Sequence, residues 1–131
     1  MNDTGIVLTG DGDKRVDVGS GTLIAGANAE GAFFKRDSES KGAADWRLSD
    51  CTSRTSATGM SHYAIGGERN RYIATGSTFE GGRLEASAHA FEGGHMLHTA
   101  NVEKGVDRSG LPEESGNIQH RNGNLIIGAA R

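Results

Sequence analysis

Residues 71–82 and 83–94 repeat one another, and this repeat constrains the fold more than any other feature of the sequence. Six of the twelve aligned positions are identical: the opening arginine, one alanine and the closing Phe-Glu-Gly-Gly. A looser third copy follows, with Met96-Leu97 as its apolar entry and residues 102–105 as its closing turn. A chain that repeats at a fixed interval usually stacks or pairs like units. The sequence therefore predicts a regular, repetitive architecture.

The composition is low in apolar residues and rich in glycine. Apolar side chains make up 34% of the 131 residues, and 21 glycines accompany a single proline. Compact domains usually contain about 45–50% apolar residues with glycine included. Spaced Ile, Leu, Val and Phe and a net charge of only −3 argue against disorder. We therefore expect one β-rich domain over residues 1–131, narrow in cross-section, whose core is completed by neighbouring subunits.

Charge and hydropathy exclude several classes of partner. The mildly acidic chain lacks the clustered basic face that phosphate contact needs, so no nucleic-acid partner is expected. No apolar run approaches the ~18 residues of a membrane span. The N-terminal segment lacks the basic-then-apolar order of a signal peptide. The lone Cys51 cannot form an intrachain disulfide, so we expect a protein made in the cytoplasm without a signal peptide.

Short apolar or alternating segments bounded by glycine and polar residues predict β-strands. The clearest ones are residues 5–10, 15–19, 22–25, 32–34 and 46–51. Helices are disfavoured, because each glycine in a helix interior costs about 1 kcal/mol. Charged and small polar residues predict an exposed loop at 35–41, and Gly110 with Pro112 predicts a long turn at 104–116. The sequence therefore predicts an all-β fold.

The C-terminal segment contains the strongest local signal. Asn122-Gly123 separates an alternating segment, residues 117–121, from an apolar one, residues 124–127. Both turn residues tolerate positive φ, which a type I′ turn requires. We therefore expect a C-terminal hairpin.

Two arrangements of the strands remain open. Two repeat units together approach one coil of a parallel β-helix, in which short strands stack on their equivalents in adjacent coils. The expected inward side chains are then Ile73, Phe79, Leu84 and Phe91, with the two phenylalanines on different faces of one coil. The alternative is an antiparallel meander, a small barrel or sandwich with Glu-Gly-Gly turns. The leading fold class is the solenoid-like β-helix with a C-terminal hairpin.

Residues 72–81 and 124–128 resemble coils of the right-handed β-helix proteins, which include bacteriophage tailspikes and polysaccharide-processing enzymes. The resemblance covers under half of the chain and rests on an apolar-x-x-Gly-x-x-aromatic-x-Gly pattern. It implies a solenoid built from stacked coils. No catalytic motif accompanies it.

Several side chains are candidates for metal or ligand binding. His95 and His98 fall on opposite faces of a strand, so a shared metal needs a turn between them or one histidine from each chain on a symmetry axis. Asp11 and Asp13, with Asp17, resemble an oxygen-rich calcium loop, although the bidentate Glu of an EF-hand is missing and an ordinary acidic turn is the alternative.

Aromatic and acidic residues complete the set of candidates. Trp46, Tyr63 and Tyr72 are the expected ligand-binding residues, as a platform that stacks on sugars, and buried anchors are the alternative. Glu80 and Glu92 hold equivalent repeat positions and could act as paired carboxylates, but a solvated turn explains them more simply. Neither the lone cysteine nor the adjacent Ser-His pair indicates a nucleophile. No catalytic residue and no cofactor is assigned.

These observations favour a non-enzymatic structural or adhesion module that acts in a symmetric assembly. The expected setting is a viral particle, as tail fibre, spike or surface decoration, so the expected location is a virion or another extracellular assembly. The expected partners are further copies of the chain, with a trimer favoured, other virion proteins and cell-surface glycan. The alternatives are a lectin-like carbohydrate-binding domain and a fragment of a β-helical polysaccharide lyase or hydrolase.

Overall fold

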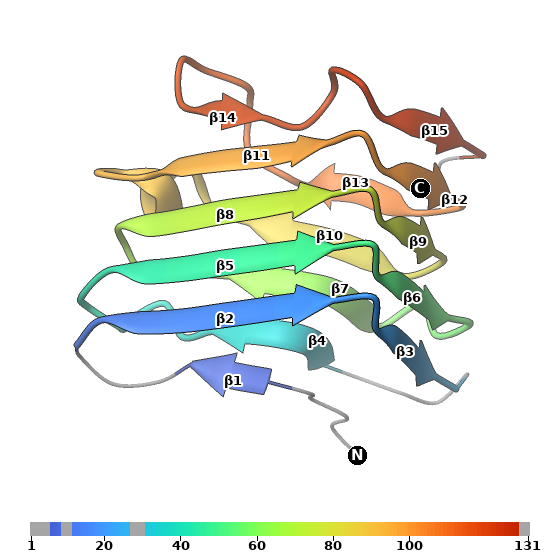
Figure 1. Ribbon diagram of the computed structural model, residues 1–131, viewed down its shortest axis with the longest axis horizontal. Coiled ribbons are helices and arrows are strands. Elements are labelled where there is room, and N and C mark those ends of the chain that lie inside the picture. The colour runs from blue at the N-terminus through green and yellow to red at the C-terminus, as the bar shows by residue number, and fades with distance from the viewer. Residues whose placement is uncertain (1–5, 9–11, 27–30, 129–131) are drawn as a thin grey trace.

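The computed structural model describes residues 6–8, 12–26 and 31–128, and these form a parallel β-solenoid (Figure 1). Three sheets of five strands each run along its length, and every pairing between the described strands is parallel. The predicted repetitive β-helical fold is confirmed, and the antiparallel meander is wrong.

Each coil contributes one strand to each sheet. Sheet one contains β1 (Ile6–Leu8), β4 (Gly31–Arg36), β7 (Met60–Ile65), β10 (Arg83–Ala86) and β13 (Asp107–Gly110). Sheet two contains β2 (Lys14–Gly19), β5 (Ala44–Ser49), β8 (Asn70–Thr75), β11 (His95–Thr99) and β14 (Ile118–Gln119). Sheet three contains β3 (Thr22–Ala25), β6 (Thr52–Thr55), β9 (Thr78–Glu80), β12 (Val102–Lys104) and β15 (Leu125–Ile127).

Helix is confined, in the described part of the chain, to the 3-10 element η1 (Ala88–Phe91) between β10 and β11. No helix in these residues is long and apolar enough to cross a bilayer.

Coil length explains the internal repeat. Tyr72 pairs with Met96, twenty-four residues further on, so two repeat units make one coil. The two units do not stack on each other, because residues 71–82 form β8 and β9 whereas residues 83–94 form β10 and η1. Coils differ in length elsewhere: Val16 pairs with Trp46, thirty residues later, and Met96 with Ile118, twenty-two residues later.

Inward side chains stack in register from coil to coil. In sheet two Val16, Trp46, Tyr72, Met96 and Ile118 form one buried apolar column. Because side chains alternate along a strand, the residues immediately before and after each column member point outward. The column therefore continues the core along the whole solenoid.

Three of the four predicted inward side chains are buried. Phe79 lies in β9 and Phe91 in η1, on different sides of the coil as expected, and Leu84 is buried in β10. The prediction for Ile73 is wrong, because its neighbours Tyr72 and Ala74 are the inward residues of β8 and alternation places Ile73 on the outer face.

The corner between sheets two and three uses one left-handed residue in every coil. Ser20, Asp50, Gly76, Ala100 and Gly123 occupy equivalent places, with φ of 55°, 54°, 66°, 57° and 78°. An L-residue pays roughly 1–2 kcal/mol of steric strain in this conformation, whereas glycine does not. Three coils therefore carry strain that the stacked corner must offset.

A ladder of side chains provides that support. Ser77 Oγ accepts a hydrogen bond from the Cys51 amide at 3.1 Å, and Asn101 Oδ1 accepts one from the Ser77 amide at 2.9 Å. Asn124 Oδ1 accepts one from the Asn101 amide at 3.1 Å. Each of these three side chains thus accepts a hydrogen bond from the backbone at the equivalent corner of the preceding coil.

The corner also corrects the prediction at the C-terminus. β14 pairs with β11 and β15 pairs with β12, so the two strands lie in different sheets and form no hairpin. Asn122-Gly123 is a solenoid corner. The Asn-Gly pair occurs in this corner as it does in a hairpin turn, because Gly123 has a positive φ here too.

The two predicted loops also differ from expectation. Within 35–41, Arg36 and Ser40 are buried. The Arg36 guanidinium donates to Asn70 Oδ1 at 2.9 Å and to the carbonyl oxygens of Glu68 and Gly42 at 2.7 and 2.8 Å. Within 104–116, the last strand of sheet one, β13, replaces part of the predicted turn.

Candidate functional site

The three aromatic residues predicted to bind a ligand lie in the core. Trp46, Tyr63 and Tyr72 each have 0% exposure. The rings of Tyr63 and Tyr72 are 4.7 Å apart, and Trp46 Nε1 donates to Asn70 Oδ1 at 3.2 Å. The prediction of a sugar-stacking platform is therefore wrong at these residues, because their strands turn them inward, and they act as buried anchors.

The metal candidates do not converge. His98 is buried on the inner face of β11, whereas His95 lies on its outer face, as their spacing predicted. Asp13 Oδ1 accepts a hydrogen bond from the Ala43 amide at 3.0 Å and ties two coils together. Asp11 lies outside the described residues. Within the described ranges no three His, Cys, Asp or Glu side chains are grouped closely enough to hold a metal ion.

The repeated glutamates also lie apart. Glu80, on the outer face of β9, pairs with Arg54 and Lys104 at 4.0 and 3.7 Å. Glu92, next to η1, pairs with His89 at 3.0 Å. Both carboxylates thus contact basic side chains at the surface.

A chain of polar side chains runs through the core instead. Tyr63 OH lies 3.2 Å from His98 Nδ1, and His98 Nε2 lies 3.0 Å from Glu103 Oε2. Arg108 Nε donates to Glu103 Oε1 at 2.7 Å, and Arg108 also donates to the His120 carbonyl oxygen. We call these five residues the core polar chain. It joins sheets one, two and three to the last coil.

Burial and hydrogen bonding together set the protonation of His98 and Glu103. Burial lowers the pKa of His98 and outweighs its hydrogen bond to Glu103. Burial alone would raise the pKa of Glu103, but hydrogen bonds from His98 and Arg108 bring it below its usual value. Neutral His98 then donates from Nε2 to the carboxylate and accepts from Tyr63 at Nδ1. Every member has a partner, so the chain holds the last coil in place.

A second buried pair resembles a nucleophilic dyad. Ser53 Oγ lies 2.6 Å from His62 Nδ1, and His62 Nε2 lies 2.7 Å from the Gly81 carbonyl oxygen. Burial lowers the pKa of His62 to about 4. Both side chains are buried, so a substrate has no access to the serine. A register shift in the pairing of β7 with β10 accompanies the inward turn of His62.

The sequence contains few signals that predict these buried polar groups. Ser53 and His62 stand on successive strands, and Glu103 and Arg108 stand on either side of a corner. Their separations match no catalytic motif. The clearest available signal was an ionisable residue at an inward position of a strand, such as His98 between Leu97 and Thr99.

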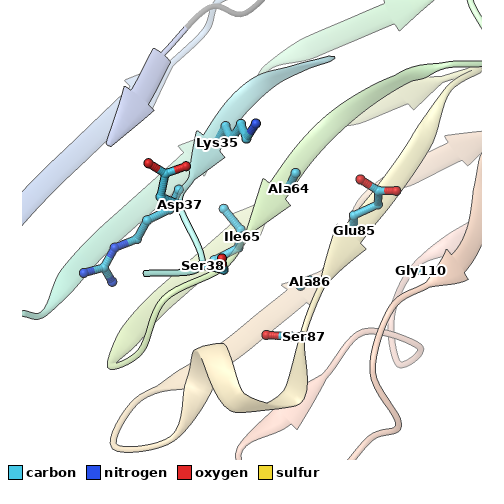
Figure 2. Close-up of a pocket in the computed structure, with 11 residues that line it drawn as sticks. Lys35, Asp37, Ser38, Ala64, Ile65, Glu85, Ala86, Ser87 and Gly110 are labelled. Carbon is cyan, nitrogen blue, oxygen red and sulfur yellow. The ribbon is translucent and has the colours of Figure 1, made fainter. Parts of the chain in front are cut away.

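A surface hollow lies on the outer face of sheet one (Figure 2). It has a volume of about 490 Å³. Lys35, Ala64, Glu85 and Gly110 follow one another in register across β4, β7, β10 and β13. Figure 2 shows Lys35 on one side and Glu85 on the other, with Ala64 between them. Ala64 thus forms a floor between the charged side chains of Lys35 and Glu85.

The hollow offers hydrogen-bonding groups to a ligand. Glu85 Oε2 accepts from Ser61 Oγ at 3.1 Å, which fixes one wall. Asp37, Ser38 and Ser87 add a carboxylate and two hydroxyls along its length. We call this hollow the sheet-one groove. Its lining thus contains both hydrogen-bond donors and acceptors.

Comparison of the chain with protein-family models, with curated proteins and with solved structures gave no match.

Proposed function

We propose that this chain is a structural or adhesion module of a larger assembly and that it catalyses no reaction. The observation that carries the proposal is the placement of its reactive side chains. Ser53, His62, His98 and Glu103 are all buried and hydrogen-bonded to one another or to the backbone. A nucleophile or general base must reach its substrate. These groups support the fold instead.

The outer faces supply the surfaces for partners. Long in-register rows of side chains on a rigid solenoid give a flat surface whose geometry is set by strand spacing. The proposed setting is a fibre, spike or surface decoration of a viral particle. The proposed partners are other copies of the chain, as a trimer in the simplest closed arrangement, and other particle proteins.

The test is the mass in solution across a dilution series, measured by light scattering with circular dichroism on the same samples. A stable oligomer with a β-type spectrum supports the proposal. A folded monomer at every concentration overturns the assembly part of it. Incubation with a panel of polysaccharides, followed by analysis of reducing ends and unsaturated products, tests the non-enzymatic part.

The sheet-one groove favours carbohydrate binding as a second function. Its volume, its small-residue floor and its rim of carboxylate, ammonium and hydroxyl groups fit a sugar. A glycan array tests this with wild type and an Ala64→Trp variant that fills the floor. A matched Thr78→Trp variant places the same ring on sheet three. Binding that Ala64→Trp alone abolishes supports the function, and no binding by wild type overturns it.

A further inference from the structure

The large apolar side chains that are exposed in the described part of the chain gather at the two ends of one sheet. Ile24 is 66% exposed on β3, and Leu125 and Ile127 are 57% and 47% exposed on β15. β3 and β15 are the opposite edge strands of sheet three, as Figure 1 shows. Isolated exposed apolar residues need no explanation, but these share a sheet, a face and an edge position.

The register makes the relationship closer. Ile24, Arg54, Glu80, Lys104 and Ile127 form one outward column across the sheet. Its three central members are charged and joined by ion pairs. The column is therefore an ordinary solvated face in the middle and apolar only where the sheet stops.

The inward columns also end on apolar residues. In sheet three the column runs from Leu23 to Ile126, and in sheet two from Val16 to Ile118. Leu23 and Ile126 are only partly buried, whereas Phe79 at the centre of their column is fully buried. Each end of sheet three thus presents the kind of side chain that the next coil covers elsewhere in the solenoid.

We propose that copies of this chain stack end to end, with β3 of one copy pairing in parallel with β15 of the next. Among the described strands nothing pairs with the outer edge of either strand, and such edges readily accept another chain. The pairing places Ile24 beside Ile127 and Leu23 against Ile126. The inference rests on the proposed assembly function and specifies its axial contact.

Sheet three is the centre of this contact. At β14, the edge strand of sheet two, the Ile118 amide and carbonyl are both hydrogen-bonded to Ser115. β15 has no such partner among the described residues. A head-to-tail contact of this kind joins two different surfaces and does not close on itself, so it builds a filament.

Complementary end-blocked variants test the proposal. Ile24→Lys blocks the β3 end, and the double variant Leu125→Lys/Ile127→Lys blocks the β15 end. Thr78→Lys adds the same charge to the middle of the same face and serves as control. Light scattering is measured on each folded variant, and on an equimolar mixture of the two blocked variants, over a dilution series.

We expect wild type and Thr78→Lys to give masses that rise with concentration. Each blocked variant should lose this axial growth, and their mixture should form one-to-one pairs and nothing longer. A single chain with Ile24→Lys and Ile127→Glu should stack again, because the new charges face each other, and added salt should weaken it. This rescue keeps the test valid if the double variant does not fold.

The outcomes separate the two proposals. If the two blocked variants oligomerise to the same extent as wild type, the stacking is overturned and the assembly proposal stands. A mixture that grows beyond pairs, or forms none, also overturns the stacking. Wild type that is monomeric at every concentration overturns both.

Discussion

Neutral His98 donates a hydrogen bond to Glu103 in the interior of the solenoid, with His98 Nε2 3.0 Å from Glu103 Oε2 and both side chains fully buried. Arg108 holds the second carboxylate oxygen at 2.7 Å. A buried charge is stabilising only with its partners present. Glu103 therefore links the core to the last coil.

Glu103→Gln should lower the free energy of unfolding by about 3 kcal/mol, because it leaves the Arg108 guanidinium with no charged partner. Glu80→Gln, which removes a surface carboxylate, should cost less than about 1 kcal/mol. Urea denaturation at pH 7 measures both. Equal losses in the two variants would contradict the structural role of Glu103.

Stability should fall on acidification between pH 6.5 and about 4. The pKa of His62 is about 4 in the folded protein, below its ordinary 6.5, so the unfolded chain binds more protons in this window. The loss from this residue should reach roughly 3 kcal/mol. His98, whose pKa is also lowered by burial, acts in the same direction.

The measurement is the free energy of unfolding at pH 7, 5.5 and 4. His62→Gln should flatten the profile, because it removes the group whose pKa is lowered to about 4. Below this range Glu103 contributes further: its folded pKa is lowered, so its stabilisation is lost as pH falls through that value. A profile unaffected by His62→Gln would contradict the assignment.

Tyr63 and Tyr72, whose ring centroids lie 4.7 Å apart, should respond oppositely to loss of the hydroxyl. Tyr72 OH is buried and has no hydrogen-bond partner among the described residues, so Tyr72→Phe should be neutral or stabilise by up to about 1 kcal/mol. Tyr63→Phe leaves His98 Nδ1 without its donor and should destabilise by about 1–3 kcal/mol. Thermal melts of the pair measure the difference, and the reverse order would contradict it.

Ala100→Gly should stabilise the protein by about 0.5–1 kcal/mol, because the left-handed corner no longer strains a side chain. The converse change Gly76→Ala should destabilise it, since φ is 66° and the new Cβ would lie 2.7 Å from Asp50 Oδ1. Chemical denaturation checks both signs. If Ala100→Gly destabilised the protein, the left-handed conformation of Ala100 would not be a source of strain in the folded state.

The sequence was sufficient to predict the repeat, but not to predict which residues of the repeat face inward on each strand. The twelve-residue repeat predicted the coil length, because coils stack only when equivalent residues recur. It did not assign Ile73 to the outer face, because a shift of one residue exchanges the two faces of a strand. Tyr72 decides the face through its packing against Tyr63, a contact between strands in different sheets.

The polar core was beyond local patterns. Arg36 lies in a run of charged and small polar residues that predicted a loop, and its burial depends on carbonyl oxygens from two other segments. Glu103 lies within residues 102–105, where the loose third repeat predicts a closing turn, whereas its inward position follows from pairing with Phe79. Such placements depend on inter-coil register, which a single coil does not encode.

The variation in coil length has a consequence for how such a protein can change. Sheet two keeps its inward column although successive partners are thirty residues apart at one end and twenty-two at the other. Insertions and deletions are therefore absorbed at corners, and strands act as fixed rungs. Duplicating one whole coil adds a single rung without altering the cross-section. The molecule's length is thus a quantity that can be adjusted in discrete steps, independently of the shape it presents to a partner.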